Sequence, residues 1–294
     1  MVIITSLRNS EKLAKKIAKS LNLKYSKTTC SNFPDGDIYL KFNADIKGEK
    51  IIIVESFQPN SNQALLDIVF ACKTAKDLGA KKVILISPYL AFMRQDKRFN
   101  PGEAINAHIM ANLINECADK FITVDPHLHR ILKMKDVFTI PAKNLTANHA
   151  IAMFIKKNIK KPIVVGPDWE SYQWADKISA EIGVEDTVLE KTRHNTRDVD
   201  VEVKKEIEIE GKDVVIVDDI ISTGNTMIKA LKESKKRRAR TVTAIGVHGL
   251  FVENGLKKMK KAGFDNIYTV NTIEHETNKI DITQTIVDEL KKII

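Results

Sequence analysis

Asp213-Val-Val-Ile-Val-Asp-Asp-Ile-Ile-Ser-Thr-Gly-Asn-Thr226 is the stretch of sequence that decides the fold. Its run from Val214 to Val217 is apolar and β-branched, which is typical of a strand buried on both faces of a parallel sheet. Asp218 and Asp219 come at the carboxyl end of that strand, where open α/β sheets bind ligands. The turn from Ser222 to Thr226 supplies hydroxyls, a glycine and N–H groups at a helix start, which suits an anion. A phosphorylated sugar would satisfy both parts of this stretch.

A polar turn that only caps the next helix is the plainer interpretation. Two adjacent acids followed by Ser-Thr-Gly-Asn-Thr in the same turn argue against it. The stretch closely resembles the phosphoribosyl-binding loop that phosphoribosyltransferases and ribose-phosphate pyrophosphokinases share. The rest of the chain has to distinguish these two classes of enzyme.

The chain has 294 residues, which is enough for two domains of ordinary size. A hydrophobic content of 43% and a charged content of 29% are typical of a soluble globular protein, and charges interrupt every apolar window. The start of the sequence lacks the basic and apolar regions of a signal peptide. Cys30, Cys72 and Cys117 lie far apart without metal-ligand spacing, which indicates thiols in a reducing compartment. We therefore expect a cytoplasmic protein without a membrane partner.

The formal net charge of +9 is compatible with a nucleic-acid partner, with anionic small substrates or with a lysine-rich surface. The densest basic run is Lys235 to Arg238 with Arg240, at the end of a predicted helix whose dipole favours cations there. No aromatic residues interleave with this run, and the sequence has no zinc-finger or RNA-binding signature. The charge pattern thus favours a solvated helix end, and we expect no nucleic-acid partner.

The two halves of the chain repeat one plan. Gly48 to Ser56 can be laid over Gly211 to Asp219, and each is followed by a loop, a helix and a further strand. The helical pattern from Ser10 to Ile17, with Ser10 as its N-cap, matches the pattern from Ser171 to Ile178. Strand, helix and strand in succession predict parallel sheets with right-handed crossovers. The fold class is therefore α/β, with two related Rossmann-like domains that arose by internal duplication.

We place the first domain at residues 1–143 and the second at residues 144–279. An amphipathic helix at residues 280–294 is expected to pack back on the first domain. The two copies differ at one point that bears on function. The first has Glu55-Ser-Phe-Gln-Pro59 where the second has the acidic pair and the glycine turn, so the first domain must have another role.

Five segments in order give the whole chain a resemblance to ribose-phosphate pyrophosphokinases, and the pattern is closest to archaeal members. They are Phe33-Pro-Asp-Gly-Asp37, Arg94-Gln-Asp96, Asp125-Pro-His127, Lys191-Thr-Arg193 and Asp218-Asp-Ile-Ile-Ser-Thr-Gly-Asn-Thr226. The resemblance implies two phosphoribosyltransferase-type domains. It also implies transfer of the β,γ-diphosphoryl group of ATP to the 1-hydroxyl of ribose 5-phosphate, with release of AMP.

The resemblance also assigns roles to residues of this sequence. Lys191 and Arg193 become the catalytic cations, and Arg193 also contacts the sugar phosphate; by sequence alone this segment reads as a solvated basic loop. The residues that hold ribose 5-phosphate are then Asp218, Asp219, Ser222, Thr223, Gly224, Asn225 and Thr226. The residues that hold ATP are Phe33, Asp35, Gly36, Asp37, Arg94, Gln95 and Asp96.

The chemistry of these side chains agrees with the ATP assignment. Arg94 offers a guanidinium for phosphate, Gln95 an amide for the purine edge, and Phe33 a ring for stacking, although Pro-Asp-Gly by itself also predicts an ordinary turn. Mg²⁺ is the implied cofactor, with His127 and Asp168 as its protein ligands. His129 stands two residues after His127, and the family pattern selects the first of the two. In the family the Phe33 loop reaches an active site of a neighbouring subunit, which implies a homo-oligomer of at least two copies.

One departure concerns the loop from Gly166 to Trp174, which is bulky and acidic where the family has Ser-Pro-Asp followed by glycines and an arginine. How this loop holds diphosphate is therefore open. A phosphoribosyltransferase would explain the sugar loop but not the duplicated first half, Arg94, Gln95 or His127. A non-catalytic regulatory relative would be expected to lose the catalytic cations or the sugar acids, and all are present. A nucleic-acid binder rests on charge alone.

Overall fold

The computed structural model describes residues 1–128, 131, 133–189 and 207–294. The chain forms two compact units, each described by itself. The first contains Met1–Thr146 together with Asn271–Glu274 and Asp281–Ile294. The second contains Ala147–Val270 and His275–Ile280.

The first unit is built on a six-stranded parallel sheet with the order β2-β1-β5-β6-β7-β8. Its central strands are apolar, β-branched runs with almost no exposed surface, as a sheet covered on both faces requires. The strands are β1 (Val2–Ser6), β2 (Lys24–Tyr25), β5 (Lys50–Val54), β6 (Lys82–Ser87), β7 (Lys120–Val124) and β8 (Ala142–Leu145).

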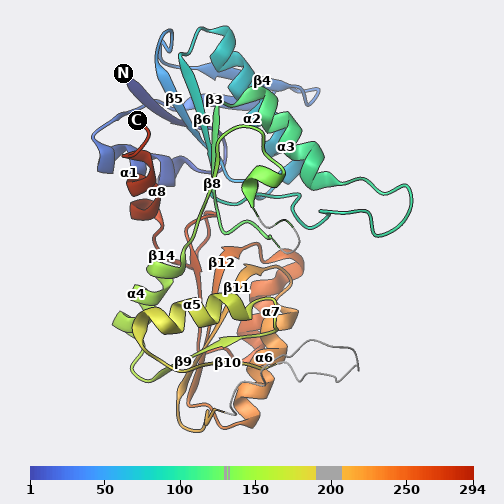
Figure 1. Ribbon diagram of the computed structural model, residues 1–294, viewed down its shortest axis with the longest axis vertical. Helices are drawn as coiled ribbons and strands as arrows, with labels where there is room; N and C mark the ends of the chain where they lie inside the picture. The colour runs from blue at the N-terminus through green and yellow to red at the C-terminus, as the bar shows by residue number, and fades with distance from the viewer. Residues whose placement is uncertain (129–130, 132, 190–206) are drawn as a thin grey trace. The chain divides into compact units, whose positions relative to one another are not determined.

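Helices cover both faces of this sheet, as right-handed crossovers in both directions from β1 and β5 require (Figure 1). On one side α1 (Glu11–Leu21) packs beside the C-terminal helix α8 (Thr283–Leu290). On the other side α2 (Ser61–Asp77) packs beside α3 (Asn106–Cys117), and a short 3₁₀ helix, Met134–Asp136, precedes β8.

A separate antiparallel hairpin belongs to the first unit. Its strands are β3 (Thr28–Asn32) and β4 (Ile38–Phe42), and their register pairs Thr28 with Phe42 and Asn32 with Ile38. The tip from Phe33 to Asp37 is exposed. The hairpin thus carries at its tip one of the segments to which the family resemblance assigns ATP binding.

The second unit repeats the first. Its six-stranded parallel sheet has the order β10-β9-β11-β12-β13-β14, which follows the first sheet strand for strand. This confirms the prediction of two related α/β domains with mainly parallel sheets. The strands are β9 (Pro162–Gly166), β10 (Asp186–Val188), β11 (Asp213–Ile221), β12 (Thr241–Gly249), β13 (Asn266–Val270) and β14 (Asn278–Ile280).

The helices of the second unit follow the same plan. One side has α4 (Asn148–Asn158) packed on α5 (Tyr172–Ile182). The other has α6 (Asn225–Lys236) packed on α7 (Gly255–Ala262), which the 3₁₀ turn Val252–Asn254 precedes. In the first unit α8 lies beside α1, and in the second unit α4 lies beside α5. The last helix of the chain therefore takes the place in the first unit that α4, the helix before β9, takes in the second.

Ser10 is the N-cap residue of α1, as the sequence predicts, but its side chain makes no capping hydrogen bond, and its hydroxyl accepts the Ser56 N–H at 2.9 Å. The expected start of the last helix was wrong. The last helix begins at Thr283 rather than at residue 280, because Ile280 pairs with Val270 in the sheet and Asp281 accepts the N–H of Thr283 at 2.8 Å. No helix in the described part of the chain is long and apolar enough to cross a membrane.

Candidate active site

The paired acids lie at the carboxyl edge of the second sheet. β11 continues to Ile221, beyond the strand that the sequence predicted, and pairs with β12 over almost its full length. Its pairing with β9 ends at Ile216. Asp218 and Asp219 therefore lie where the neighbouring strand has already turned away into the loop before α5.

Ser171 connects that loop to the acids. Its hydroxyl lies 2.8 Å from one carboxylate oxygen of Asp168 and 2.8 Å from one of Asp218, and its N–H donates to Asp168 at 2.9 Å. The N–H of Asp219 donates to Asp218 at 3.0 Å. The structure thus brings together three acids that the sequence assigned to two roles. Ser171 was overlooked as a site residue, although its alignment with Ser10 at a helix start was visible in the repeat.

The electrostatics of this cluster favour a positively charged or hydrogen-donating ligand. Burial, together with the neighbouring carboxylates of Asp219 and Asp168, raises the pKa of Asp218 well above its usual range, against the lowering effect of the Ser171 hydroxyl. Ligand hydroxyls or a cation would relieve this crowding of like charges. Hard oxygen donors suit Mg²⁺, which takes few protein ligands. Within the described residues, however, no group of three or more His, Cys, Asp or Glu side chains is placed to hold a metal.

The turn after β11 has the backbone geometry of an anion site. Gly224 has φ +78°, a backbone conformation that residues other than glycine rarely adopt, and it directly precedes α6. The turn also packs closely on α7, because a Cβ on Gly255 would lie 2.8 Å from the carbonyl oxygen of Ser222. The two glycines allow the turn to present the first N–H groups of α6 to a ligand.

A pocket of about 350 Å³ lies beside this turn. Of the residues that the sequence assigned to a site, Asp168 and Thr226 border it, and they share it with Lys229 and Glu233 from the next turns of α6. Among the described residues, the lining consists of Pro167, Asp168, Leu189, Thr226, Lys229, Ala230 and Glu233. Lys229 and Glu233 were not identified from sequence, because a charged residue on an exposed helix side carries no motif.

The remaining site candidates of the described chain belong to the first unit. At the hairpin tip Gly36 has φ +100°, its N–H donates to the carbonyl of Phe33 at 2.9 Å, and the Phe33 ring is half exposed. Pro-Asp-Gly therefore forms a turn, as its composition predicts. Between β6 and α3, Arg94 is exposed and Asp96 is buried.

His127 follows β7 at the carboxyl edge of the first sheet. Gln95 lies between Arg94 and Asp96, and its main-chain carbonyl accepts the Ala107 N–H at 3.3 Å. Lys191, Arg193 and His129 lie outside the described residues.

Comparisons with known proteins match both units. The N-terminal domain model of ribose phosphate pyrophosphokinase matches residues 2–117, and the phosphoribosyl transferase domain model matches residues 134–289. The chain is 35% identical to the ribose-phosphate pyrophosphokinase of Methanobrevibacter smithii, over 96% of this chain and 97% of that one. It is 36% identical to the enzyme of Sulfolobus acidocaldarius, over 85% and 86% of the two chains.

The chain belongs to the ribose-phosphate pyrophosphokinase family. This confirms the resemblance drawn from the five motifs. The crystal structure of the phosphoribosylpyrophosphate synthetase from Mycobacterium smegmatis has the same fold, with a TM-score of 0.85 at 23% identity over 99% of this chain and 98% of that one.

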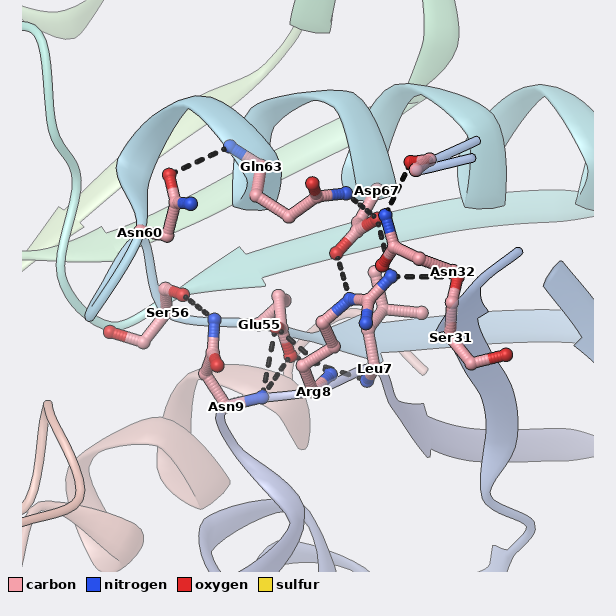
Figure 2. A network of polar contacts seen from close by, with 11 residues as sticks. Leu7, Arg8, Asn9, Ser31, Asn32, Glu55, Ser56, Asn60, Gln63 and Asp67 are labelled. Atoms are coloured by element: carbon pink, nitrogen blue, oxygen red, sulfur yellow. Dashed lines mark hydrogen bonds and ion pairs between the residues drawn. The ribbon is translucent and has the colours of Figure 1, made fainter. Parts of the chain in front are cut away.

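In this pyrophosphokinase-family chain the strand-end acid of the first unit is bound by its own loop. Glu55 is fully buried at the end of β5, and its carboxyl oxygens accept the N–H groups of Leu7, Arg8 and Asn9 at 3.0 to 3.2 Å (Figure 2). The side-chain amide of Asn9 also donates to the carbonyl of Ser56 at 3.1 Å. Backbone groups that would serve a ligand at a helix start here serve the protein itself.

Proposed function

We propose that this chain is a ribose-phosphate diphosphokinase that feeds nucleotide biosynthesis. It transfers the β,γ-diphosphoryl group of ATP to the 1-hydroxyl of ribose 5-phosphate and gives 5-phosphoribosyl 1-diphosphate and AMP. One observation carries the proposal: in a chain of this family, the acidic strand end and the glycine turn occur together at the edge of the second sheet.

The sugar side is assigned to the second unit. Asp218 and Asp219 accept hydrogen bonds from adjacent ribose hydroxyls, which fixes the ring. The turn of Ser222, Thr223, Gly224, Asn225 and Thr226 donates N–H and hydroxyl groups to the 5-phosphate. This division is supported by the contact of Ser171 with Asp218 and by the left-handed backbone at Gly224.

The nucleotide side is assigned to the first unit. The half-exposed ring of Phe33 offers a stacking surface, and the acids of the same tip offer acceptors for the adenine amino group or the ribose. Arg94, Gln95 and Asp96 complete this set. Lys191 and Arg193 are proposed to place positive charge on the transferred group and the leaving group, because phosphoryl transfer depends on such stabilisation.

Mg²⁺ is the proposed cofactor. Asp168 and His127 are its proposed protein ligands, and the nearby Asp218 carboxylate, which shares the Ser171 hydroxyl with Asp168, supports the first of these. When bound, the ion would neutralise phosphate charge. Ser171 holds Asp168 in place through its hydroxyl and its N–H.

Two further proposals complete the functional assignment. A homo-oligomer of two or more copies follows from the proposed reach of the Phe33 tip into the site of a neighbouring copy. A cytoplasmic location is supported by the state of Cys30, Cys72 and Cys117, which are free thiols.

The test is an assay of AMP release from ATP and Mg²⁺, with and without ribose 5-phosphate. We expect ribose-dependent AMP, and we expect Lys191→Ala to reduce kcat by about 10²-fold or more, the scale of losing one preorganised charge. Lys232→Ala, on the exposed side of α6, is the matched control and should leave the rate unchanged. Absence of ribose-dependent AMP would refute the activity. Consumption of phosphoribosyl diphosphate with a nucleobase would identify a phosphoribosyltransferase instead.

A further inference from the structure

The Arg8 side chain links three elements of the first unit (Figure 2). Its Nε donates to Asp67 of α2 at 2.6 Å, and its Nη2 donates to the carbonyl oxygen of Ser31 in β3 at 2.9 Å. The backbone of Arg8 is itself fixed, because its N–H donates to Glu55 at 3.1 Å. A planar guanidinium therefore connects the loop before α1, the helix α2 and the hairpin in one fixed geometry.

The acid in this contact is unusual for its burial. Asp67 has no exposed surface, and its carboxylate also accepts from the side-chain amide of Gln63 at 2.8 Å. Buried carboxylates are retained only where they are paired and hydrogen-bonded. The Arg8 side chain is about a quarter exposed, so Asp67 is the buried member of the ion pair and Arg8 is the member that reaches the surface. Asp67 thus holds the guanidinium in an orientation in which Nη2, which also donates to Asp67 at 3.5 Å, reaches the Ser31 carbonyl.

The hairpin depends on such external contacts. A two-stranded hairpin is marginally stable by itself, and the outer residues of β3 and the whole tip are exposed. Its base is held by the hydroxyl contact between Thr28 and Thr5 at 2.7 Å. The Arg8 contact lies further along β3, two residues before Phe33, where the tip begins.

We propose that Arg8, oriented by Asp67, is a positioning residue for the nucleotide-binding tip from Phe33 to Asp37. It acts through the Ser31 carbonyl and does not touch the nucleotide. This inference rests on the proposed assignment of ATP to the tip. It assigns a function to two charged residues that lie outside the five motifs.

The test uses Arg8→Lys in the full-length protein. A lysine keeps a cation beside the buried Asp67, but its single ammonium cannot reproduce the fork that reaches both Asp67 and the Ser31 carbonyl. We expect the KM for ATP to rise about tenfold, the scale of one charge-assisted hydrogen bond, while the KM for ribose 5-phosphate stays within about twofold. Amide hydrogen exchange of residues 31–40 should become faster. Lys12→Met is the matched control, because Lys12 pairs with Glu274 at the surface of the same unit.

An unchanged KM for ATP, or an equal rise of both KM values, would overturn the inference. Unchanged exchange at residues 31–40 would overturn it as well. Should the wild-type protein release no ribose-dependent AMP, the Kd for Mg²⁺·ATP, measured by calorimetry without ribose 5-phosphate, decides the matter. A Kd about tenfold weaker in Arg8→Lys would support the positioning role independently of the reaction. Equal values, or no ATP binding by the wild-type protein, would refute it.

Discussion

An acid stands at equivalent positions of the two units, directly after β5 and within β11, the third strand of each sheet, and the two units use that acid differently. In the first unit Glu55 accepts three N–H groups from the loop before α1 and is fully buried. In the second unit Asp218 accepts from the Ser171 hydroxyl and the Asp219 N–H, and it faces two other carboxylates. The same scaffold thus gives, in one copy, an acid whose carboxyl group is hydrogen-bonded by the backbone of its own unit. In the other copy it gives an acid that faces other carboxylates.

The helices after these strands differ in the same sense. The buried positions of α2 and α6 have the same spacing, so Asp67 corresponds to Ala230. In the first unit Asp67 pairs with Arg8, whereas in the second unit Ala230 lines the pocket. A polar network therefore occupies, in the first copy, the position at which the second copy is open to a ligand.

The largest expected effect is the pH dependence of stability that Glu55 contributes in the first copy. Burial raises the pKa of Glu55 to about 8, although its three N–H donors oppose this. A raised folded-state pKa means that the folded chain keeps a proton that the unfolded chain loses. We therefore expect the free energy of unfolding to be highest below the ordinary pKa of 4.5 and to fall as the pH rises towards 8. The slope from this group is at most about 1.4 kcal/mol per pH unit.

Urea unfolding of the wild-type protein and of Glu55→Gln at several pH values between 4.5 and 8.5 measures this contribution. The variant cannot titrate at this position, so its stability should fall less over that range. If the two curves run parallel, the N–H donors outweigh burial, and Glu55 is then a bound carboxylate like that of a ligand.

The second prediction concerns Asp218→Asn. The neutral amide has one acceptor oxygen, whereas the carboxylate has two oxygens and a negative charge with which to accept from two ribose hydroxyls. We therefore expect a loss of about 30- to 100-fold in ribose 5-phosphate affinity. Calorimetric titration with ribose 5-phosphate measures it, and Mg²⁺·ATP affinity should stay within about twofold. Glu55→Gln is the matched control, since it changes the equivalent acid of the other unit. Loss of ATP binding with intact ribose 5-phosphate binding would reverse the division of substrates between the units.

The third prediction tests the glycine turn. Gly224→Ala forces a side chain into the left-handed region, where a Cβ would also lie 2.7 Å from the Met259 side chain. We expect about tenfold weaker binding of ribose 5-phosphate, from roughly 1 kcal/mol or more of backbone strain in the phosphate turn. Gly263→Ala imposes the same kind of strain at φ +99° with open space around it. An equal loss in both variants would mean that the effect is on general stability and not on the turn.

Much of this could be predicted from the sequence. Apolar β-branched runs such as Ile51–Val54 and Val214–Val217 fix the buried strands, and the repeat fixes the duplicated α/β plan. The acids and the glycine turn were identifiable because a binding motif is local in sequence. These are the features for which chemistry and short-range spacing coincide.

The rest depends on contacts between segments far apart in the chain. Ser10 occupies the N-cap position that its pattern predicts, but the pattern does not show that its hydroxyl accepts the Ser56 N–H, which follows β5. Arg8 and Asp67 are 59 positions apart, and neither belongs to a motif. Periodicity even predicts an apolar residue at position 67, because it faces the core of the helix packing. Such polar networks become visible only when the fold has placed their partners.

The smallest predicted effect is that of Lys229, the one cation among the described residues that line the pocket of the second unit. The loop from Pro167 to Ser171 has no basic residue, so Lys229 can supply positive charge for phosphate on this side of the site. We expect Lys229→Met to weaken ribose 5-phosphate binding about threefold, because the side chain is exposed and solvent screens its charge. The loss should shrink as ionic strength increases. Lys232→Met, three residues further along the same helix and not among the residues that line the pocket, controls for the change in net charge. An equal effect there would mean that Lys229 acts only through the overall positive charge of the protein.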